Sequence, residues 1–390
     1  MHVIGKINLL EDRSRMAKDI REIGNNKIRY RALAEWLSQQ IDTGALPYGV
    51  RIPSETALCN RFGLSRQTVR NALKALQESG YISSHQGKGS FVARNMMPQR
   101  SNTIGVFLNF ADNYVFPEVL SAIVSTLQEK GYGIDLGIGY NRVSLERDFL
   151  QRMINCNAAG IIIRGTKSGL PNPNHALYQQ LLRTRTPLVF VQNYYPNIPC
   201  HAVVLDDCNM MYQLTQRLID AGHRKIGGIF KFDDAEGQQR YLGYIQALMD
   251  NHIPVEEGLI SWFESSDAAS DTSGREASYD LFAAIVAEKC TAVVCYNDKT
   301  AAAIIMRLEN LGKKVPDDLS VVGFDGESVE QLRIRNLSLT SVIHPKAELG
   351  ITAAQVLLEM IDAANSYPQS VVEHPISCRI NDGNSIRPIV

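Results

Sequence analysis

The sequence predicts an α/β protein in which a small winged helix-turn-helix domain precedes a larger domain of two lobes, each built on a parallel sheet. Three observations carry this prediction. Residues 27–93 contain helix-cap signals followed by a hairpin with glycines in its loop. From residue 103 onward, apolar runs of four to six residues alternate with amphipathic helical patterns, which is typical of parallel sheets covered on both faces. The small domain is also basic, whereas the rest of the chain is acidic.

The most informative element of the small domain is a helix predicted to begin after Ser65. A serine suits this place because its hydroxyl accepts a hydrogen bond from an otherwise unpaired N–H of the first turn. The polar residues of the first two turns are Arg66, Gln67, Thr68 and Arg70. In a helix that enters the major groove, these turns meet base edges and phosphates. Apolar residues at spacings of three and four form the opposite face, which we expect to be buried.

The elements around this helix complete the winged domain. A shorter helix is predicted from its cap Ser54 to Phe62, and Gly63 begins the turn between the two helices. An amphipathic helix is predicted earlier, over residues 30–41. Two short strands, 81–84 and 90–92, are joined by the loop 85–89. The glycines of this loop let the backbone approach a duplex closely, and Gln86 and Lys88 are candidate contacts there.

The charge distribution agrees with DNA contact at one end of the chain. Residues 27–94 contain ten basic and four acidic side chains, a net charge of plus six. Residues 1–26 have a net charge of plus one, so residues 95–390 must have about minus eight to give the total of minus one. Basic charge concentrated in a small domain favours phosphate contact by that domain.

The composition excludes several other classes of protein. The seven cysteines are scattered and form no C-x-x-C pair, so we expect neither a zinc site nor a disulfide framework. A reducing cytoplasm fits this pattern best. No apolar run approaches the length of a membrane span, which is ~18 residues. The first residues lack the apolar core of a signal peptide, which argues against a secreted solute-binding protein.

These patterns predict four parts of the chain. Residues 1–26 form an N-terminal extension, 27–93 the winged domain, 94–102 a polar linker and 103–390 the large domain. The strands expected in the large domain are 104–108, 133–137, 160–163, 188–191, 225–230, 292–295 and 319–324. The helices expected there are 119–130, 144–154, 175–183, 239–249 and 299–311.

Polar and aromatic residues follow these predicted strands. In open α/β sheets, ligands bind at the carboxyl ends of the strands, so residues there are candidates for a ligand site. Carboxylates, amides, basic groups and aromatic rings together suit a polyhydroxylated sugar, whose hydroxyls donate and accept and whose C–H faces stack. An alternative stays open for Asn193, Asn297 and Asp325, because asparagine and aspartate at such positions also cap the next helix.

Four ordered motifs between Leu46 and Val92 resemble the DNA-binding domain of the GntR family: LPYGVRIPSE, LSRQTVRNALKAL, GYI and GKGSFV. Tyr48 is the one departure from the family pattern. The resemblance implies DNA-contacting or contact-supporting roles for Arg51, Ser54, Glu55, Ser65, Arg66, Thr68, Arg70 and Gly89. For the arginines, the alternative is a solvated surface charge.

Segments of the large domain resemble, in order, the sensor domain of LacI/GalR regulators, which is related to type I periplasmic sugar-binding proteins. The most specific segment is VPDDLSVVGFD, residues 315–325. A GntR-type domain before such a sensor is the arrangement of the AraR arabinose repressors, which YVFP, GIFKFDD and TSVIHPK also resemble. The resemblance implies an effector site formed by Tyr114, Phe116, Arg164, Lys167, Asn193, Tyr194, Lys231, Arg240, Asn297, Asp325 and His344. It also implies that the effector is a sugar, with L-arabinose the first candidate.

The expected mechanism follows from this resemblance. A homodimer would place two winged domains on a roughly palindromic operator in double-stranded DNA, and sugar binding would weaken the DNA-competent state. No cofactor, metal or membrane partner is expected. Three alternatives stay open: a different sugar or glycoside as effector, activation in place of repression, and a transport-type binding protein. An enzyme is disfavoured, because the large domain has no H-E-x-x-H, G-x-S-x-G or P-loop motif.

Overall fold

The computed structural model describes residues 26–42, 45–46, 49–85, 89–93, 100–110, 115–265, 273–328, 332, 334, 337–363 and 367–389. The chain divides into two units, residues 1–99 and 100–390, and each is described by itself. None of the helices in the described ranges combines the length and apolar character needed to cross a lipid bilayer.

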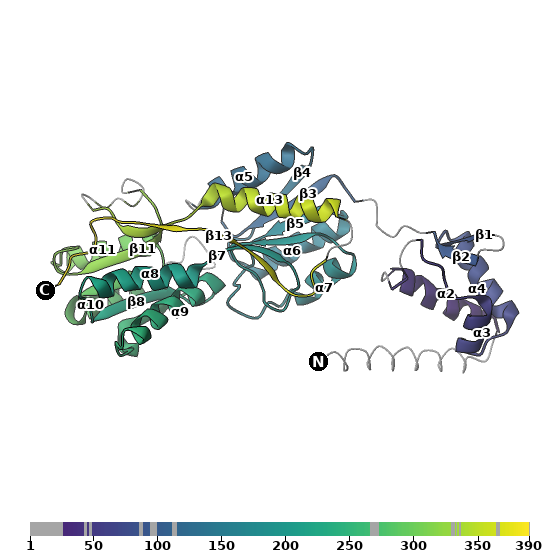
Figure 1. Cartoon of the computed structure of the whole chain (residues 1–390), viewed down its shortest axis with the longest axis horizontal. Coiled ribbons are helices and arrows are strands. Elements are labelled where there is room, and N and C mark those ends of the chain that lie inside the picture. The colour runs from purple at the N-terminus through teal and green to yellow at the C-terminus, as the bar shows by residue number, and fades with distance from the viewer. Residues whose placement is uncertain are drawn as a thin grey trace. The chain divides into compact units, whose positions relative to one another are not determined.

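The first unit is a winged helix-turn-helix domain. Its elements are α2 (Asn26–Asp42), α3 (Glu55–Phe62), α4 (Arg66–Glu78), β1 (Ile82–His85) and β2 (Gly89–Val92). Strands β1 and β2 pair antiparallel as the wing, and all five elements are labelled in Figure 1. Helices α3 and α4 begin after the predicted caps Ser54 and Ser65, and Gly63 ends α3 in the left-handed conformation with a φ of 63°.

The second unit has two lobes, each with a six-stranded sheet. The strands of the first lobe are β3 (Thr103–Leu108), β4 (Gly133–Ile138), β5 (Gly160–Ile163), β6 (Leu188–Val191), β7 (His201–Leu205) and β13 (Val372–Ile376). They lie in the order β13-β7-β6-β5-β3-β4 and all pair in parallel. The helices of this lobe are α5 (Phe116–Gln128), α6 (Val143–Asn155), α7 (His175–Arg183) and α13 (Lys346–Asp362).

The second lobe repeats this architecture. Its strands are β8 (Ile226–Lys231), β9 (Ile260–Phe263), β10 (Ala292–Cys295), β11 (Ser320–Asp325), β12 (Thr340–Ile343) and β14 (Arg379–Asn381). Their order is β14-β12-β11-β10-β8-β9, and the edge strand β14 is antiparallel to β12. Its helices are α8 (Asp207–Asp220), α9 (Ala235–Asp250), the 3-10 turn η1 (Glu257–Leu259), α10 (Ser273–Lys289) and α11 (Asp298–Asn310).

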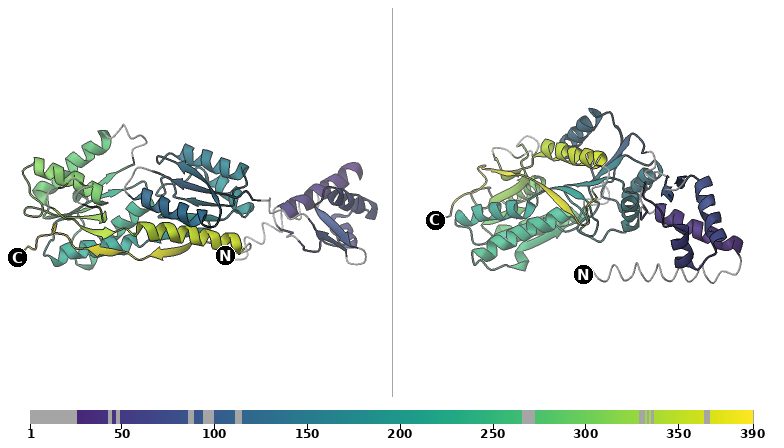
Figure 2. Two further views of the ribbon diagram at one scale, coloured as in Figure 1. Left: turned by 90° about the horizontal axis from the view of Figure 1, so that it is seen from above. Right: turned by 45° about the vertical axis from the view of Figure 1, so that its right-hand side comes forward.

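Helices cover both faces of each sheet, as Figure 2 shows from two directions. In the first lobe, α5 and α13 pack together on one face, and α6 and α7 lie on the other. The two faces contribute to different cores, one around Val106 and Ile162, the other around Phe107 and Ile161. The alternation follows from the strand period of two, because neighbouring residues of a strand point to opposite faces. The predicted fold class is therefore confirmed.

The chain crosses between the lobes three times: from β7 to α8, from β12 to α13, and from β13 to β14. Neither lobe is therefore continuous in sequence. The carboxyl ends of the strands of both sheets meet at these crossings, which positions the polar residues that follow the strands.

The second unit begins at Arg100, inside the segment 94–102 that was predicted to be a linker. Residues 94–99 lie outside the described residues, but residues 100–102 bind the first lobe. The Arg100 guanidinium donates to the carbonyl of Ala158 at 3.1 Å. The Ser101 N–H donates to the carbonyl of Asn157 at 2.9 Å. Three residues that the sequence analysis placed in the linker are therefore anchored to the second unit.

Candidate functional site

The start of helix α4 is fixed by two residues of the predicted DNA-binding set. The Ser65 hydroxyl accepts from the backbone N–H of Thr68 at 3.2 Å, and the two hydroxyl oxygens are 2.8 Å apart. Thr68 is only 4% exposed, so its side chain supports the helix start instead of facing solvent. Arg66, Gln67 and Arg70 are exposed on the other side of the same turns. They form the surface that the sequence analysis assigned to DNA.

Helix α3 positions one of these arginines. The Ser54 hydroxyl caps α3 by accepting from the N–H of Ala57 at 3.2 Å, which places Glu55 in the first turn. The Glu55 carboxylate accepts from Nε of Arg70 at 3.0 Å. Because this pair is exposed, its contribution to stability is small. Its effect is to tie the Arg70 head group on α4 to the first turn of α3.

A further arginine of the winged domain, Arg51, lies against the wing. Gly89 has a φ of +100°, and a Cβ there would lie 2.7 Å from Nε of Arg51. Arg51 in turn pairs with Phe91 of β2 through an isolated β-bridge. The positive φ at position 89 favours glycine, because other residues adopt it only with strain. The predicted wing contacts Gln86 and Lys88 lie outside the described residues.

A second group of residues, six of which belong to the predicted effector set, gathers between the lobes of the second unit. We call this group the interlobe cluster. Its members are Arg164, Gln192 and Asn193 of the first lobe, Lys231, Asp234, Glu236, Arg240, Tyr296 and Asp325 of the second, and Asp207 and His344 at the crossings. All are buried except Gln192 and Tyr296, which are half-buried.

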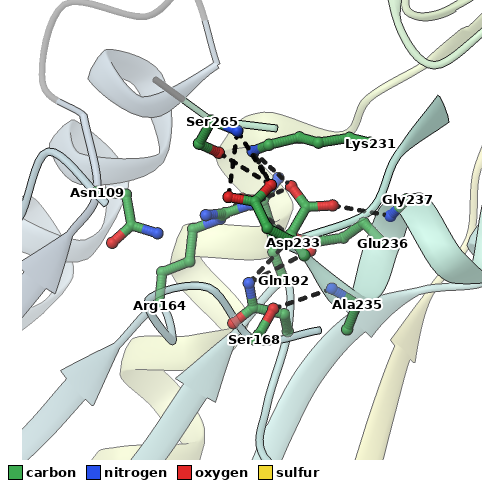
Figure 3. A network of polar contacts seen from close by, with 12 residues as sticks. Asn109, Arg164, Ser168, Gln192, Lys231, Asp233, Ala235, Glu236, Gly237 and Ser265 are labelled. Carbon is green, nitrogen blue, oxygen red and sulfur yellow. Dashed lines mark hydrogen bonds and ion pairs between the residues drawn. The ribbon is translucent and has the colours of Figure 1, made fainter. Parts of the chain in front are cut away.

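Arg164, directly after β5, joins the two lobes. Its Nη2 donates to Oε1 of Glu236 at 2.7 Å, and its Nε donates to the side-chain oxygen of Gln192 at 3.0 Å. The Asn193 amide donates to the same Glu236 carboxylate at 3.2 Å. The guanidinium also lies 5.3 Å from the ring centre of Phe116. Figure 3 shows Arg164, Gln192 and Glu236 converging from different elements. Two donors of the first lobe thus meet one carboxylate of the second.

Arg240 organises the second lobe. Its Nε donates to Oδ1 of Asp207 at 2.7 Å, and its Nη1 donates to the carbonyl of Tyr296 at 2.7 Å. The guanidinium stacks on the ring of Phe324, 3.6 Å from its centre, with Asp325 3.9 Å away. Burial alone lowers the pKa of an arginine, but Asp207 and its neighbours outweigh burial and raise the pKa of Arg240. Arg240 therefore stays charged in the buried site.

The Asp234 carboxylate accepts hydrogen bonds from three groups. Oδ1 caps helix α9 by accepting from the N–H of Gly237 at 2.9 Å. Oδ2 accepts from Nζ of Lys231 at 2.8 Å and from the Tyr296 hydroxyl at 2.9 Å. Burial by itself raises the pKa of this carboxyl, but Lys231 and Arg164 outweigh burial and lower it. Asp234 is therefore ionised at neutral pH.

Further hydrogen bonds join the two lobes beside the interlobe cluster. The Asn141 amide donates to Asp233 at 3.2 Å, and Asp233 also accepts from the N–H of Ser265 at 3.1 Å. The Ser168 hydroxyl accepts from the N–H of Ala235 at 3.0 Å. Figure 3 shows Ser168, Asp233 and Ser265 in this position. The two lobes are thus in direct polar contact.

His344 lies at the crossing from β12 to α13. Its Nε2 is 2.7 Å from the amide nitrogen of Gln192, so the ring accepts from this amide. Its Nδ1 is buried and has no hydrogen-bond partner among the described residues. Burial, with Arg240 and Lys346 nearby, lowers the pKa of His344 to about 3. The imidazole is therefore neutral at physiological pH.

Six of the predicted effector residues come together in the interlobe cluster: Arg164, Asn193, Lys231, Arg240, Asp325 and His344. Phe116 lies against Arg164. Asn297 caps α11 by accepting from the N–H of Thr300 at 3.0 Å, the alternative that the sequence analysis left open. Lys167 joins the site region through its backbone N–H, which donates to Asn141. The Tyr194 hydroxyl donates to Glu373, away from the cluster, and Tyr114 lies outside the described residues.

The predicted effector set lacked five members of the cluster: Gln192, Asp207, Asp234, Glu236 and Tyr296. Helix α9 begins at Ala235, four residues before the predicted start, because Asp234 caps it. This early start turns Glu236 inward from the first turn, where it is 4% exposed. The capping pattern Asp234-Ala-Glu236 was the signal that could have found it.

The comparisons with known proteins agree with this architecture. The model of "Bacterial regulatory proteins, gntR family" matches residues 29–92, and that of "Periplasmic binding protein-like domain" matches residues 215–385. The structure of the transcription regulator CcpA of Lactococcus lactis aligns with a TM-score of 0.60 at 24% identity, over 74% of this chain and 100% of that one.

Two curated relatives extend over both units. An arabinose metabolism transcriptional repressor of Geobacillus stearothermophilus is 35% identical over 337 residues, which is 86% of this chain and 91% of that protein. One from Halalkalibacterium halodurans is 30% identical over 360 residues, 89% of this chain and 94% of that protein. These relatives are regulators and not enzymes. The chain belongs to the family of transcriptional regulators, including the arabinose metabolism repressors, in which a GntR-type winged domain precedes a periplasmic-binding-protein-like sensor.

Proposed function

We propose that this regulator represses sugar-utilisation genes and that L-arabinose, bound at the interlobe cluster, releases it from its operator. The observation that carries the proposal is the cluster itself, in which buried donors and acceptors of both lobes converge at the carboxyl ends of the strands. The two relatives are repressors of arabinose metabolism, which supports L-arabinose as the effector.

The chemistry of the cluster suits a neutral sugar. Three cations, Arg164, Lys231 and Arg240, lie among four carboxylates, so opposite charges are nearly balanced. Sugar hydroxyls can accept from the cations and donate to the carboxylates, which is the pattern that recognises a polyol. Phe116 offers an apolar ring beside Arg164 for the C–H face of a sugar. The backbone of Asp325, with a φ of 109°, is strained at this place, which is typical of binding sites.

The winged domain supports operator binding through α4 and the wing. Arg66, Gln67 and Arg70 would meet the major groove, with Ser54, Glu55, Ser65 and Thr68 holding the helices in place. Arg51, seated over Gly89, would contact the backbone of the duplex. Two such domains in a cytoplasmic homodimer would match the two halves of a palindromic operator.

Coupling between the two sites requires that the sugar distinguishes two states of the sensor. A ligand shifts such an equilibrium only by its difference in affinity for the two states. The Arg164–Glu236 pair joins the lobes at the place where the sugar would bind. A sugar that replaces or bridges this pair changes how the lobes close. This change would alter the positions of the two winged domains in the dimer.

The test uses the full chain and a panel of L-arabinose, D-xylose, D-galactose and D-ribose. L-arabinose at ~100 times its dissociation constant should stabilise the sensor by about 2.7 kcal/mol in thermal denaturation. The operator is first selected from random duplexes, and fluorescence anisotropy then follows its release as L-arabinose is added. Stabilisation by another sugar alone, or DNA binding that is indifferent to L-arabinose, would overturn the proposed effector.

A further inference from the structure

A pocket of about 820 Å³ lies between the lobes beside the interlobe cluster. We call it the side pocket. Its walls are the loops 168–172 and 192–197 of the first lobe, the crossing 204–208, the first turn of α9 at 235–239, and Glu373 and Pro375 of β13. The volume is at the upper end of the range of small-molecule sites, about 300–1,000 Å³, and is much larger than one pentose requires.

The side pocket and the interlobe cluster share four residues: Gln192, Asn193, Asp207 and Glu236. Glu236 shows how close the two sites are. Its carboxylate accepts from Arg164 and Asn193 within the cluster, and the same residue lines the pocket. A molecule bound at the cluster would therefore have the side pocket as its immediate neighbour.

The lining of the side pocket selects a chemical class. It contains four carboxylates, those of Asp206, Asp207, Glu236 and Glu373. No lysine, arginine or histidine occurs among the described residues that line it. Arg240 pairs with Asp207 and Arg164 with Glu236, whereas Asp206 and Glu373 have no cation partner among the described residues. Because like charges repel, such a lining disfavours phosphate esters and sugar acids.

The other lining groups point to a neutral polyol. The exposed amides of Asn197 and Gln239 add donors and acceptors to the pocket. Gln238 adds an acceptor, because its amide nitrogen already donates to the carbonyls of Gly169 and Phe232. Tyr194 and Pro196 add flat apolar surface of the kind on which a sugar ring packs. The Tyr194 hydroxyl donates to Glu373, which ties the loop 192–197 to β13 and fixes this wall.

We propose that the side pocket is a second sugar subsite, so that the effectors of this regulator include arabinosides as well as the free pentose. One arabinose unit occupies the interlobe cluster, and the unit attached to it extends past Glu236 into the side pocket. This inference rests on the proposed function, because it takes the cluster as the first subsite. It also gives Tyr194 a place in recognition, as part of the second subsite.

The test compares L-arabinose with α-1,5-linked L-arabinobiose by isothermal titration calorimetry on the full chain. We expect arabinobiose to bind with a stoichiometry of one per chain, to compete with L-arabinose, and to bind about tenfold more tightly through its additional contacts. Two variants locate the second unit. Gln239→Trp fills the pocket from an exposed position of α9, and Met249→Trp places the same bulk at an exposed position of that helix outside the pocket.

Gln239→Trp should lower the affinity for arabinobiose at least tenfold and leave that for L-arabinose unchanged, whereas Met249→Trp should change neither. Binding of L-arabinose without arabinobiose, or equal sensitivity of both sugars to Gln239→Trp, overturns the second subsite while the proposed function stands. Binding of arabinobiose without L-arabinose supports the subsite and overturns the free pentose as effector. If neither sugar binds, both proposals are wrong.

Discussion

The winged domain and the sensor use arginine in opposite ways. In the winged domain, the Arg70 side chain is 62% exposed and has one carboxylate partner, Glu55. In the sensor, the side chains of Arg164 and Arg240 are 6% and 4% exposed and are held by several partners each. An exposed guanidinium can exchange water for a phosphate or a base at little cost. A buried guanidinium is part of the fold, and a ligand must compete with its partners.

This difference predicts how the two regions respond to substitution. Loss of an exposed arginine should affect DNA binding and leave stability nearly unchanged. Loss of a buried arginine should affect stability first, because a charged partner remains inside the protein. Four experiments test the contrast.

The largest effect is expected for Arg240→Ala. This substitution leaves Asp207 buried without its cation, although burial raises the pKa of that carboxyl to about 7 and so lets it take up a proton. We expect a loss of about 3–5 kcal/mol in the free energy of unfolding of the sensor, measured by urea denaturation. Adding Asp207→Asn should recover part of the loss. A loss below ~1 kcal/mol would show that Arg240 does not anchor the cluster.

Arg66→Ala should weaken operator binding by about 1–3 kcal/mol, the usual contribution of a good base contact. Its effect on stability should be within ~0.5 kcal/mol, because the side chain is exposed. Lys74→Ala is the matched control, since Lys74 is exposed two turns later on α4 and pairs with Glu78. Equal losses for both variants in anisotropy titrations would indicate general phosphate attraction and not recognition by the first turns.

His344 makes the stability of the sensor depend on pH. Its pKa is about 3 in the folded protein, below the ordinary value of 6.5, so the unfolded chain binds a proton first as the pH falls. Its contribution is therefore fully present above pH 6.5 and is lost toward pH 3, at ~1.4 kcal/mol for each unit. Urea denaturation between pH 7 and pH 5 measures the slope. His344→Asn should reduce it, and an unchanged slope would mean that other groups cause the dependence.

The smallest effect is expected for Ser65→Ala. Loss of the hydroxyl that caps α4 should destabilise the winged domain by ~1 kcal/mol. Operator affinity should fall as well, because the same turn presents Arg66. Ser79→Ala, at the other end of α4, is the control. If the two variants unfold at the same urea concentration, the Ser65 cap contributes nothing measurable.

The comparison also explains which features could be predicted from the sequence. The caps Ser54 and Ser65 and the stop at Gly63 are local signals, and each is found where it was predicted. Members of the interlobe cluster depend on contacts between segments far apart in sequence. Asp207 and Arg240 are 33 positions apart, and Gln192 and His344 are 152 apart. No periodicity or spacing indicates such pairs. The residue pattern indicated strand ends, whereas Arg240, inside helix α9, entered the predicted set through the family resemblance.

Asn297 shows a second limit of sequence reasoning. The same strand-end position can cap a helix or face a ligand, and its oxygen accepts from the N–H of Thr300 in the structure. Helix α13 and strand β13 show a third. Both belong to the first lobe, although they follow β7 in the chain by more than 130 residues. The sequence pattern that predicted parallel sheets does not indicate which of the two lobes such late segments join.

The three crossings between the lobes bear on how this protein is made. Strand β13 completes the edge of the first sheet beside β7, although it is synthesised more than 160 residues after β7. Until residues 372–376 emerge, β7 has an unpaired edge that is open to wrong pairing. The winged domain, in contrast, is complete after about a quarter of the chain. A nascent chain could therefore possess its DNA-binding surface well before it possesses a finished sensor to control it.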